Sequence, residues 1–105
     1  MKSLIPCMIV ATSLVISGAA LAAEPAAGKS KCNMCHALNK KVVGPSFMDI
    51  SMKYKGDPDA VAKLEANITK GGSFGWKYTN MPPRGMGASN AEVKEMAEYI
   101  AGLAK

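Results

Sequence analysis

The most constraining feature of this sequence is a run of five residues, Cys32-Asn33-Met34-Cys35-His36. Two cysteines separated by two residues, with a histidine directly after the second, form the motif that attaches haem covalently. Residues three positions apart share one face of a helical turn, so both thiols can reach the two vinyl groups along one porphyrin edge. The motif therefore predicts thioether bonds from Cys32 and Cys35 and an iron–imidazole bond from His36.

A cysteine pair has two other common uses, and the rest of the sequence favours neither. A structural zinc site needs four ligands, whereas residues 23–105 contain only Cys32, Cys35 and His36 among the sulfur and imidazole donors that such sites use. A thioredoxin-like redox pair belongs near a strand–helix–strand pattern, and no alternating strand pattern is found here. Haem attachment is therefore the interpretation that the motif supports best.

The first 22 residues have the pattern of a secretory signal peptide. A short basic start precedes an uncharged, mainly apolar run from Leu4 to Leu21, and Ala20-Leu21-Ala22 supplies a small-x-small cleavage site. The run is close to the length that spans a membrane, but its serines, its glycine and Pro6 weaken that alternative. We expect cleavage after Ala22, a periplasmic domain of residues 23–105, and no stable membrane anchor.

The mature chain is small and of mixed charge. It is long enough for one domain, and a domain this short usually needs a disulfide, a metal or a covalent cofactor for stability. Haem would serve that purpose and would consume both thiols, which an exported protein would otherwise tend to oxidise. The sequence has 13 basic residues, of which Lys2 is lost with the leader, against 8 acidic ones. This balance is too even to indicate nucleic-acid binding.

Hydrophobic periodicity predicts an all-α fold with three well-defined helices and a short first one. Ser46 is the expected N-cap of the second helix, and Asp57-Pro58 the expected start of the third. The last helix begins with a capping box formed by Ser89 and Glu92 and continues as an apolar stripe. The helices are expected at about residues 26–31, 46–55, 57–70 and 89–104.

The long segment of residues 73–87 is the expected source of the sixth iron ligand. It follows a Gly71-Gly72 helix stop and has no helical period, and loops of about this length in small domains are usually functional. Methionine is the available neutral donor, since His36 is the only histidine. Met81 is favoured because Pro82-Pro83 stiffens its backbone, while Met86, between two glycines, remains the alternative.

Two further residues are candidates for contacts with the cofactor. The Pro45 carbonyl could accept the second ring N–H of His36 and so fix the tautomer of a ligating imidazole. A plain Gly44-Pro45 turn explains the same residues equally well. The Trp76 indole N–H could reach a haem propionate, and its ring could also pack against the haem edge. From the residues alone, both assignments stay open.

The order and spacing of these motifs resemble those of the small bacterial class I cytochromes c. The resemblance covers about residues 26–104 and depends on Cys32-x-x-Cys35-His36, Val43-Gly44-Pro45, Trp76, Met81-Pro82-Pro83 and the capped last helix. It implies the compact all-α cytochrome c fold of three to four helices around one covalently attached haem c, with His36 and Met81 as axial ligands. It also implies that the Pro45 carbonyl bonds His36, that Trp76 contacts a propionate, and that the first helix packs against the last.

Three positions depart from the family pattern. Ala27 and Gly28 stand where the first helix often carries an aromatic residue, and Asn67 stands where the middle helix often has a basic one. Arg84 replaces an asparagine that often follows the proline pair. These departures concern, respectively, the contact between the first and last helices, the haem propionates and the methionine ligand.

A histidine and a methionine together leave no open position on the iron, so the predicted function is the transfer of single electrons rather than catalysis. We expect a monomer that forms transient, partly electrostatic complexes with larger redox proteins, such as an oxidase, a reductase or a quinol-oxidising complex. Four basic residues in the predicted loops would attract an acidic partner: Lys40, Lys41, Lys77 and Arg84. The alternatives are an electron-entry subunit of a larger oxidoreductase, and a haem enzyme or gas sensor with a labile sixth ligand.

Overall fold

The structure is a computed structural model that describes residues 23–104. Its elements in chain order are η1 (Gly28–Cys32), α1 (Phe47–Lys53), α2 (Ala60–Lys70) and α3 (Asn90–Leu103). Within the described range there is no β-strand, and none of these helices is long and apolar enough to cross a membrane. The predicted all-α fold is confirmed. The signal peptide predicted for residues 1–22 lies outside the described residues.

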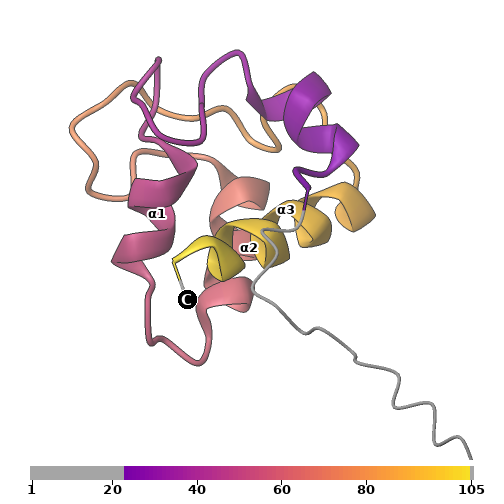
Figure 1. The fold of residues 1–105 in the computed structure, drawn as a ribbon. Helices are drawn as coiled ribbons and strands as arrows, with labels where there is room; N and C mark the ends of the chain where they lie inside the picture. The colour runs from indigo at the N-terminus through magenta and orange to yellow at the C-terminus, as the bar shows by residue number, and fades with distance from the viewer. Residues whose placement is uncertain (1–22, 105) are drawn as a thin grey trace, which may run out of the picture.

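The core forms where α3 packs on α2 and α1. Figure 1 shows α2 and α3 packed together with α1 beside them, while η1 and the long connecting segments gather at the other end of the molecule. Met96 and Ala97 of α3 are almost completely buried, at 1% and 0% exposure. They belong to one apolar cluster with Phe47 of α1 and with Leu64 and Ile68 of α2. Helix α3 is therefore the common base on which the rest of the fold is built.

The segment that leads into the cysteine pair and ends at Cys32 forms a π-helix, η1. The Asn33 N–H donates to the Gly28 carbonyl, 2.9 Å away, which widens the turn just before Cys35. The Glu24 side chain covers Gly28 so closely that a Cβ there would lie 2.8 Å from Glu24 Cγ. Ala27 is buried in the core cluster. The N-terminal segment thus packs closely on itself at Gly28 and contributes Ala27 to the core.

Two of the predicted helix caps are confirmed. The Asp49 N–H donates to Ser46 Oγ at the start of α1, 3.0 Å away. At the start of α3, the Glu92 N–H donates to Ser89 Oγ at 3.2 Å, and the Ser89 N–H donates to Glu92 Oε1 at 3.0 Å. Because these side chains satisfy N–H groups that have no partner inside the helix, they fix where α1 and α3 begin.

The predicted start of α2 is wrong by a few residues. The helix begins at Ala60, with Asp59 as its N-cap, rather than at Asp57-Pro58. Asp57 instead forms a turn, in which its Oδ1 accepts from the Asp59 N–H at 2.8 Å and its carbonyl accepts from the Ala60 N–H at 3.2 Å. An aspartate can cap a turn as readily as a helix, so the residue type alone did not distinguish the two starts.

Candidate haem site

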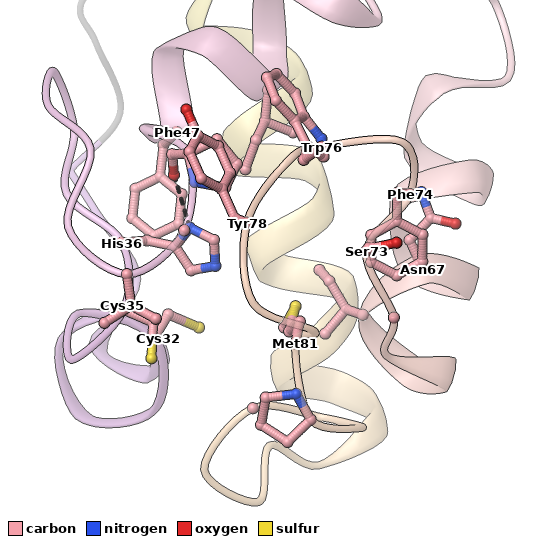
Figure 2. A pocket seen from close by; sticks show the side chains of 18 of the residues that line it. Cys32, Cys35, His36, Phe47, Asn67, Ser73, Phe74, Trp76, Tyr78 and Met81 are labelled. Carbon is pink, nitrogen blue, oxygen red and sulfur yellow. Dashed lines mark hydrogen bonds between the residues drawn. The ribbon is translucent and has the colours of Figure 1, made fainter.

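A largely apolar cavity opens between the N-terminal segment, the helices and the segment that follows α2 (Figure 2). Its empty volume, including the open mouth, is about 1020 Å³. The apolar lining includes side chains from all three α-helices: Phe47, Ile50, Leu64, Ile68, Met96 and Ile100. The six residues predicted to bind the cofactor also line it: Cys32, Cys35, His36, Pro45, Trp76 and Met81.

Cys32 and Cys35 are half-buried free thiols that lie on the same side of the cavity as His36 (Figure 2). Burial, reinforced by the negative charge of Glu24, raises the pKa of the Cys32 thiol to about 11. This thiol is therefore protonated at neutral pH. Among residues 23–104, no three His, Cys, Asp or Glu side chains gather into a group that could hold a metal ion, and a structural zinc site would need such a group.

His36 is buried and oriented by a hydrogen bond to the main chain. Its Nδ1 lies 2.7 Å from the Pro45 carbonyl oxygen. Since a carbonyl can only accept, Nδ1 donates the proton and Nε2 keeps its lone pair. Figure 2 shows the second ring nitrogen directed into the cavity. The ring is therefore held in the tautomer and orientation that a metal-ligating histidine uses.

Two neighbouring residues fix the plane of the His36 ring. Phe47 stacks on it, with ring centroids 5.3 Å apart and an interplanar angle of 23°. Phe47 is in turn held edge-on by Tyr99 of α3, at 6.3 Å between centroids. Gly44 lies so close to the imidazole that a Cβ there would be 2.7 Å from His36 Cε1. No side chain fits at position 44 unless the ring moves.

Met81 lies across the cavity from His36, on the segment that follows α2 (Figure 2). Its side chain is half-buried, and its sulfur faces the cavity. Its main chain pairs with Gly72, because the N–H of each residue donates to the carbonyl of the other at 2.9 Å. The thioether is therefore carried by a backbone that is attached to the end of α2.

The alternative ligand, Met86, also lines the cavity but is 55% exposed. Its N–H donates to the Lys31 carbonyl, 3.2 Å away. Met96 reaches the cavity from α3, but it is almost fully buried in the core cluster. Of these three methionines, Met81 combines a place on the wall that faces His36 with an anchored main chain and a side chain outside the core.

Trp76 belongs to a stack of aromatic and lysine side chains beside the cavity. Its ring stacks on that of Tyr78, with centroids 6.2 Å apart and an interplanar angle of 15°. Lys41 Nζ lies 4.5 Å from the Tyr78 ring centroid, and Lys53 Nζ lies 4.9 Å from that of Trp76. Such cation–π contacts order both lysines. The sequence placed Trp76 at this site but not Tyr78, although two aromatics two residues apart in an extended segment can share a side.

The cavity lining contains a hydrogen-bonded polar pair, Tyr54 and Asn67, that the sequence did not predict. Asn67 Nδ2 donates to the Tyr54 hydroxyl oxygen at 2.9 Å, and both residues line the cavity. The Tyr54 hydroxyl accepts in this contact, so its own proton can be donated elsewhere. Tyr54 is at the end of α1 and Asn67 is in α2, so the two residues meet only because the helices pack together. Asn67 is thus paired with a neutral partner at the position where the family pattern has a basic residue.

These features together fit a covalently bound haem. Two thiols and an imidazole with a free Nε2 share one wall, a thioether enters from the facing wall, and the surfaces between them are largely apolar. The glycine at position 44 leaves room for the imidazole and for nothing larger beside it. A helical domain with this arrangement belongs to the class of proteins that hold one haem through a cysteine pair and a histidine.

Comparison with known proteins gives the same class. The chain matches the family model for cytochrome c over residues 17–104. It is 39% identical to cytochrome c-552 of Hydrogenobacter thermophilus over 88 residues, which cover 84% of this chain and 88% of the relative. It is 35% identical to cytochrome c-551 of Allochromatium vinosum over 92 residues, covering 88% of this chain and 97% of the relative. The crystal structure of wild-type Nitrosomonas europaea cytochrome c552 superposes with a TM-score of 0.65 at 39% identity, covering 71% of this chain and 91% of that one.

The chain belongs to the cytochrome c family. Its relatives named cytochrome c-551 and c-552 place it among the small class I monohaem cytochromes, as the sequence motifs predicted. Its cofactor is one covalently attached haem c, and it acts in electron transfer rather than as an enzyme. The roles of individual residues toward the haem stay predictions.

Proposed function

We propose that this protein carries single electrons through a haem iron whose axial ligands are His36 and Met81. The observation that supports this proposal is that two neutral donors on separate segments face one apolar cavity, with the cysteine pair on the His36 side. When bound, the haem supplies a one-electron Fe(II)/Fe(III) couple, whose potential a thioether ligand raises. Cys32 and Cys35 would hold the porphyrin edge by thioether bonds.

The protein contributes positioning and the exclusion of water. The bond to the Pro45 carbonyl and the stacking of Phe47 hold the His36 ring in place, and the pairing with Gly72 holds the Met81 main chain. Because the protein would hold His36 and the Met81 main chain in place, little rearrangement would accompany electron transfer. Trp76 and the Tyr54–Asn67 pair offer the cavity N–H and O–H donors, which suit the haem propionates.

A comparison of two methionine variants tests the ligand assignment. In the ferric holoprotein, a thioether ligand gives a weak red sulfur-to-iron charge-transfer band. We expect Met81→Ala to lose this band and Met86→Ala to keep it. The opposite result would identify Met86 as the sixth ligand of the iron. A band that survives in both variants would exclude both methionines as the ligand.

We also propose that the partners are acidic redox proteins, such as an oxidase, a reductase or a quinol-oxidising complex, bound briefly by a monomer. Lys41 is exposed and lies over Tyr78, whose ring lines the cavity, so positive charge is held close to the proposed haem. Lys40 and Lys77 are exposed on the neighbouring loops. Association rates should fall as ionic strength rises, and rates that do not change with salt would contradict electrostatic steering.

Export to the periplasm is the remaining part of the proposal. It depends on the basic start, the apolar run and the Ala20-Leu21-Ala22 site in the sequence. Mass spectrometry of the holoprotein, purified from a host that exports and matures c-type cytochromes, should give a chain that begins at Ala23. A chain that retains residues 1–22 would instead indicate an uncleaved anchor.

A further inference from the structure

The end of α2 lies directly against the main chain that carries Met81. A Cβ at Gly71 would lie 2.5 Å from the Met81 carbonyl oxygen, 2.7 Å from Pro83 N and 2.9 Å from the Pro82 carbonyl carbon. Side chains do not approach main-chain atoms this closely. Position 71 also has a φ of +71°, a conformation that glycine adopts without strain. The loop can therefore rest on the helix end only because residue 71 has no side chain.

We propose that Gly71 is a positioning residue for Met81: the missing side chain lets the loop seat on α2 and sets how far the Met81 thioether enters the cavity. This inference rests on the proposed ligation by Met81. It deepens that proposal, because it names what holds the ligand at the required depth. Ligands must be held within roughly half an ångström of their working position for a site to function well.

Main-chain hydrogen bonds hold the loop against this seat at three points. Met81 and Gly72 exchange two N–H to carbonyl bonds of 2.9 Å. The Arg84 N–H donates to the Ile68 carbonyl at 2.7 Å, which satisfies one of the carbonyls that α2 leaves without an internal partner. The Met86 N–H donates to the Lys31 carbonyl, next to Cys32. The segment is thus fixed to α2 and to the cysteine-bearing segment.

None of these three contacts involves the Met81 side chain. The main-chain contacts therefore position Met81 without the help of a bond to iron. A shift of the loop away from α2 would withdraw the sulfur while leaving the helices intact. Gly71 is the residue at which a single methyl group produces that shift.

The chain provides matched controls. Gly56 and Gly87 have φ values of +82° and +92°, so alanine is strained there, as it is at Gly71. In contrast to Gly71, a Cβ at either position meets no heavy atom within 4 Å. Gly56 follows α1, away from the loop, whereas Gly87 lies only a few residues beyond Met81. The three alanine variants share the backbone strain, and only Gly71→Ala adds the collision with the Met81 main chain.

The experiment compares Gly71→Ala, Gly56→Ala and Gly87→Ala as holoproteins. We expect all three to lose thermal stability through backbone strain, and Gly71→Ala to lose the most because of the added collision. Gly71→Ala alone should lose or weaken the ferric red band and bind added imidazole, a competitor for the iron, at least about tenfold more tightly. A Gly71→Ala protein with the band and imidazole affinity of the two controls would overturn the proposal. If Met81→Ala keeps the band, it is the ligand assignment that fails, so the two failures are distinguishable.

A second measurement uses the unaltered holoprotein and applies even if Gly71→Ala does not fold. Saturating imidazole should displace the Met81 sulfur, and hydrogen exchange then reports on the Gly72 and Met81 amides. If the seat holds the main chain by itself, both amides should stay protected when the sulfur leaves. Loss of their protection on imidazole binding would show that the iron bond holds the loop, and would contradict the proposed role of Gly71.

Discussion

The two walls of the cavity are built in different ways. The His36 wall is local in sequence, because Cys32, Cys35, His36 and the Pro45 carbonyl all come from one short stretch of chain. The Met81 wall also depends on residues farther away in sequence, since its loop is bonded to Lys31 and Ile68 as well as to nearby Gly72. A wall made of neighbours can be recognised from spacing, whereas a wall made of distant contacts is set by how the helices pack.

The largest expected effect is the loss of stability when an aromatic residue of one wall is replaced by alanine. Phe47 is 2% exposed, stacks on His36 and meets Tyr99. Replacing a buried phenylalanine by alanine costs about 3–5 kcal/mol, so Phe47→Ala should lower the free energy of unfolding of the holoprotein by that amount. Denaturant titration followed by circular dichroism measures it.

Phe74 is the matched control on the other wall. It lines the cavity but is less buried than Phe47, so Phe74→Ala should cost less, because less apolar area is lost. Equal costs for the two variants would show that the Met81 wall is as tightly packed as the His36 wall, and would remove this difference between them.

The second prediction concerns space beside the imidazole. A Cβ at Gly44 would lie 2.7 Å from His36 Cε1 and 3.2 Å from Nδ1, so Gly44→Ala must displace the ring. We expect a loss of about 1–3 kcal/mol from overpacking and a weakened bond between Nδ1 and the Pro45 carbonyl. The NMR signal of the His36 Nδ1 proton should shift and exchange faster with water.

The red band provides the comparison for Gly44→Ala. If the two walls are independent, Gly44→Ala should mainly change the NMR signals of the His36 imidazole. Gly71→Ala should mainly change the sulfur-to-iron band. A Gly44→Ala protein that loses the red band while its Nδ1 proton is unchanged would contradict the separate construction of the walls.

The features that could be predicted from the sequence are those that a local pattern indicates. The Ser46 and Ser89 caps act over three residues and were predicted correctly, and the six residues expected at the site do line one cavity. The start of α2 was wrong because Asp57 caps a turn instead of a helix. The Tyr54–Asn67 bond and the seat at Gly71 were not visible, because each depends on segments brought together by packing. In the sequence, Gly71 indicated only a helix end.

The third prediction tests helix α3, which supports both walls of the cavity. Ser89 Oγ accepts from the Glu92 N–H at the start of α3, and loss of such a cap costs about 1 kcal/mol. Ser89→Ala should lower the free energy of unfolding by that amount without changing the red band or the Nδ1 proton signal. Ser89→Asp, which keeps a capping oxygen, should restore most of the stability. A selective change at either wall would show that α3 does not support the two equally.

The smallest expected effect is a dependence on pH at the same cap. Glu92 accepts a hydrogen bond from the Ser89 N–H, and this bond holds the pKa of its carboxyl below the ordinary value of 4.5. A group whose pKa is lowered by folding stabilises the protein above its unfolded pKa, and this contribution is lost as pH falls through the folded pKa. The stability difference between the native protein and Glu92→Gln should therefore be present at neutral pH and shrink below about pH 4.5. Because Glu92 does not line the cavity, the red band should not follow this titration. A difference that stays constant down to acid pH would mean that the charge of Glu92 does not contribute to the cap.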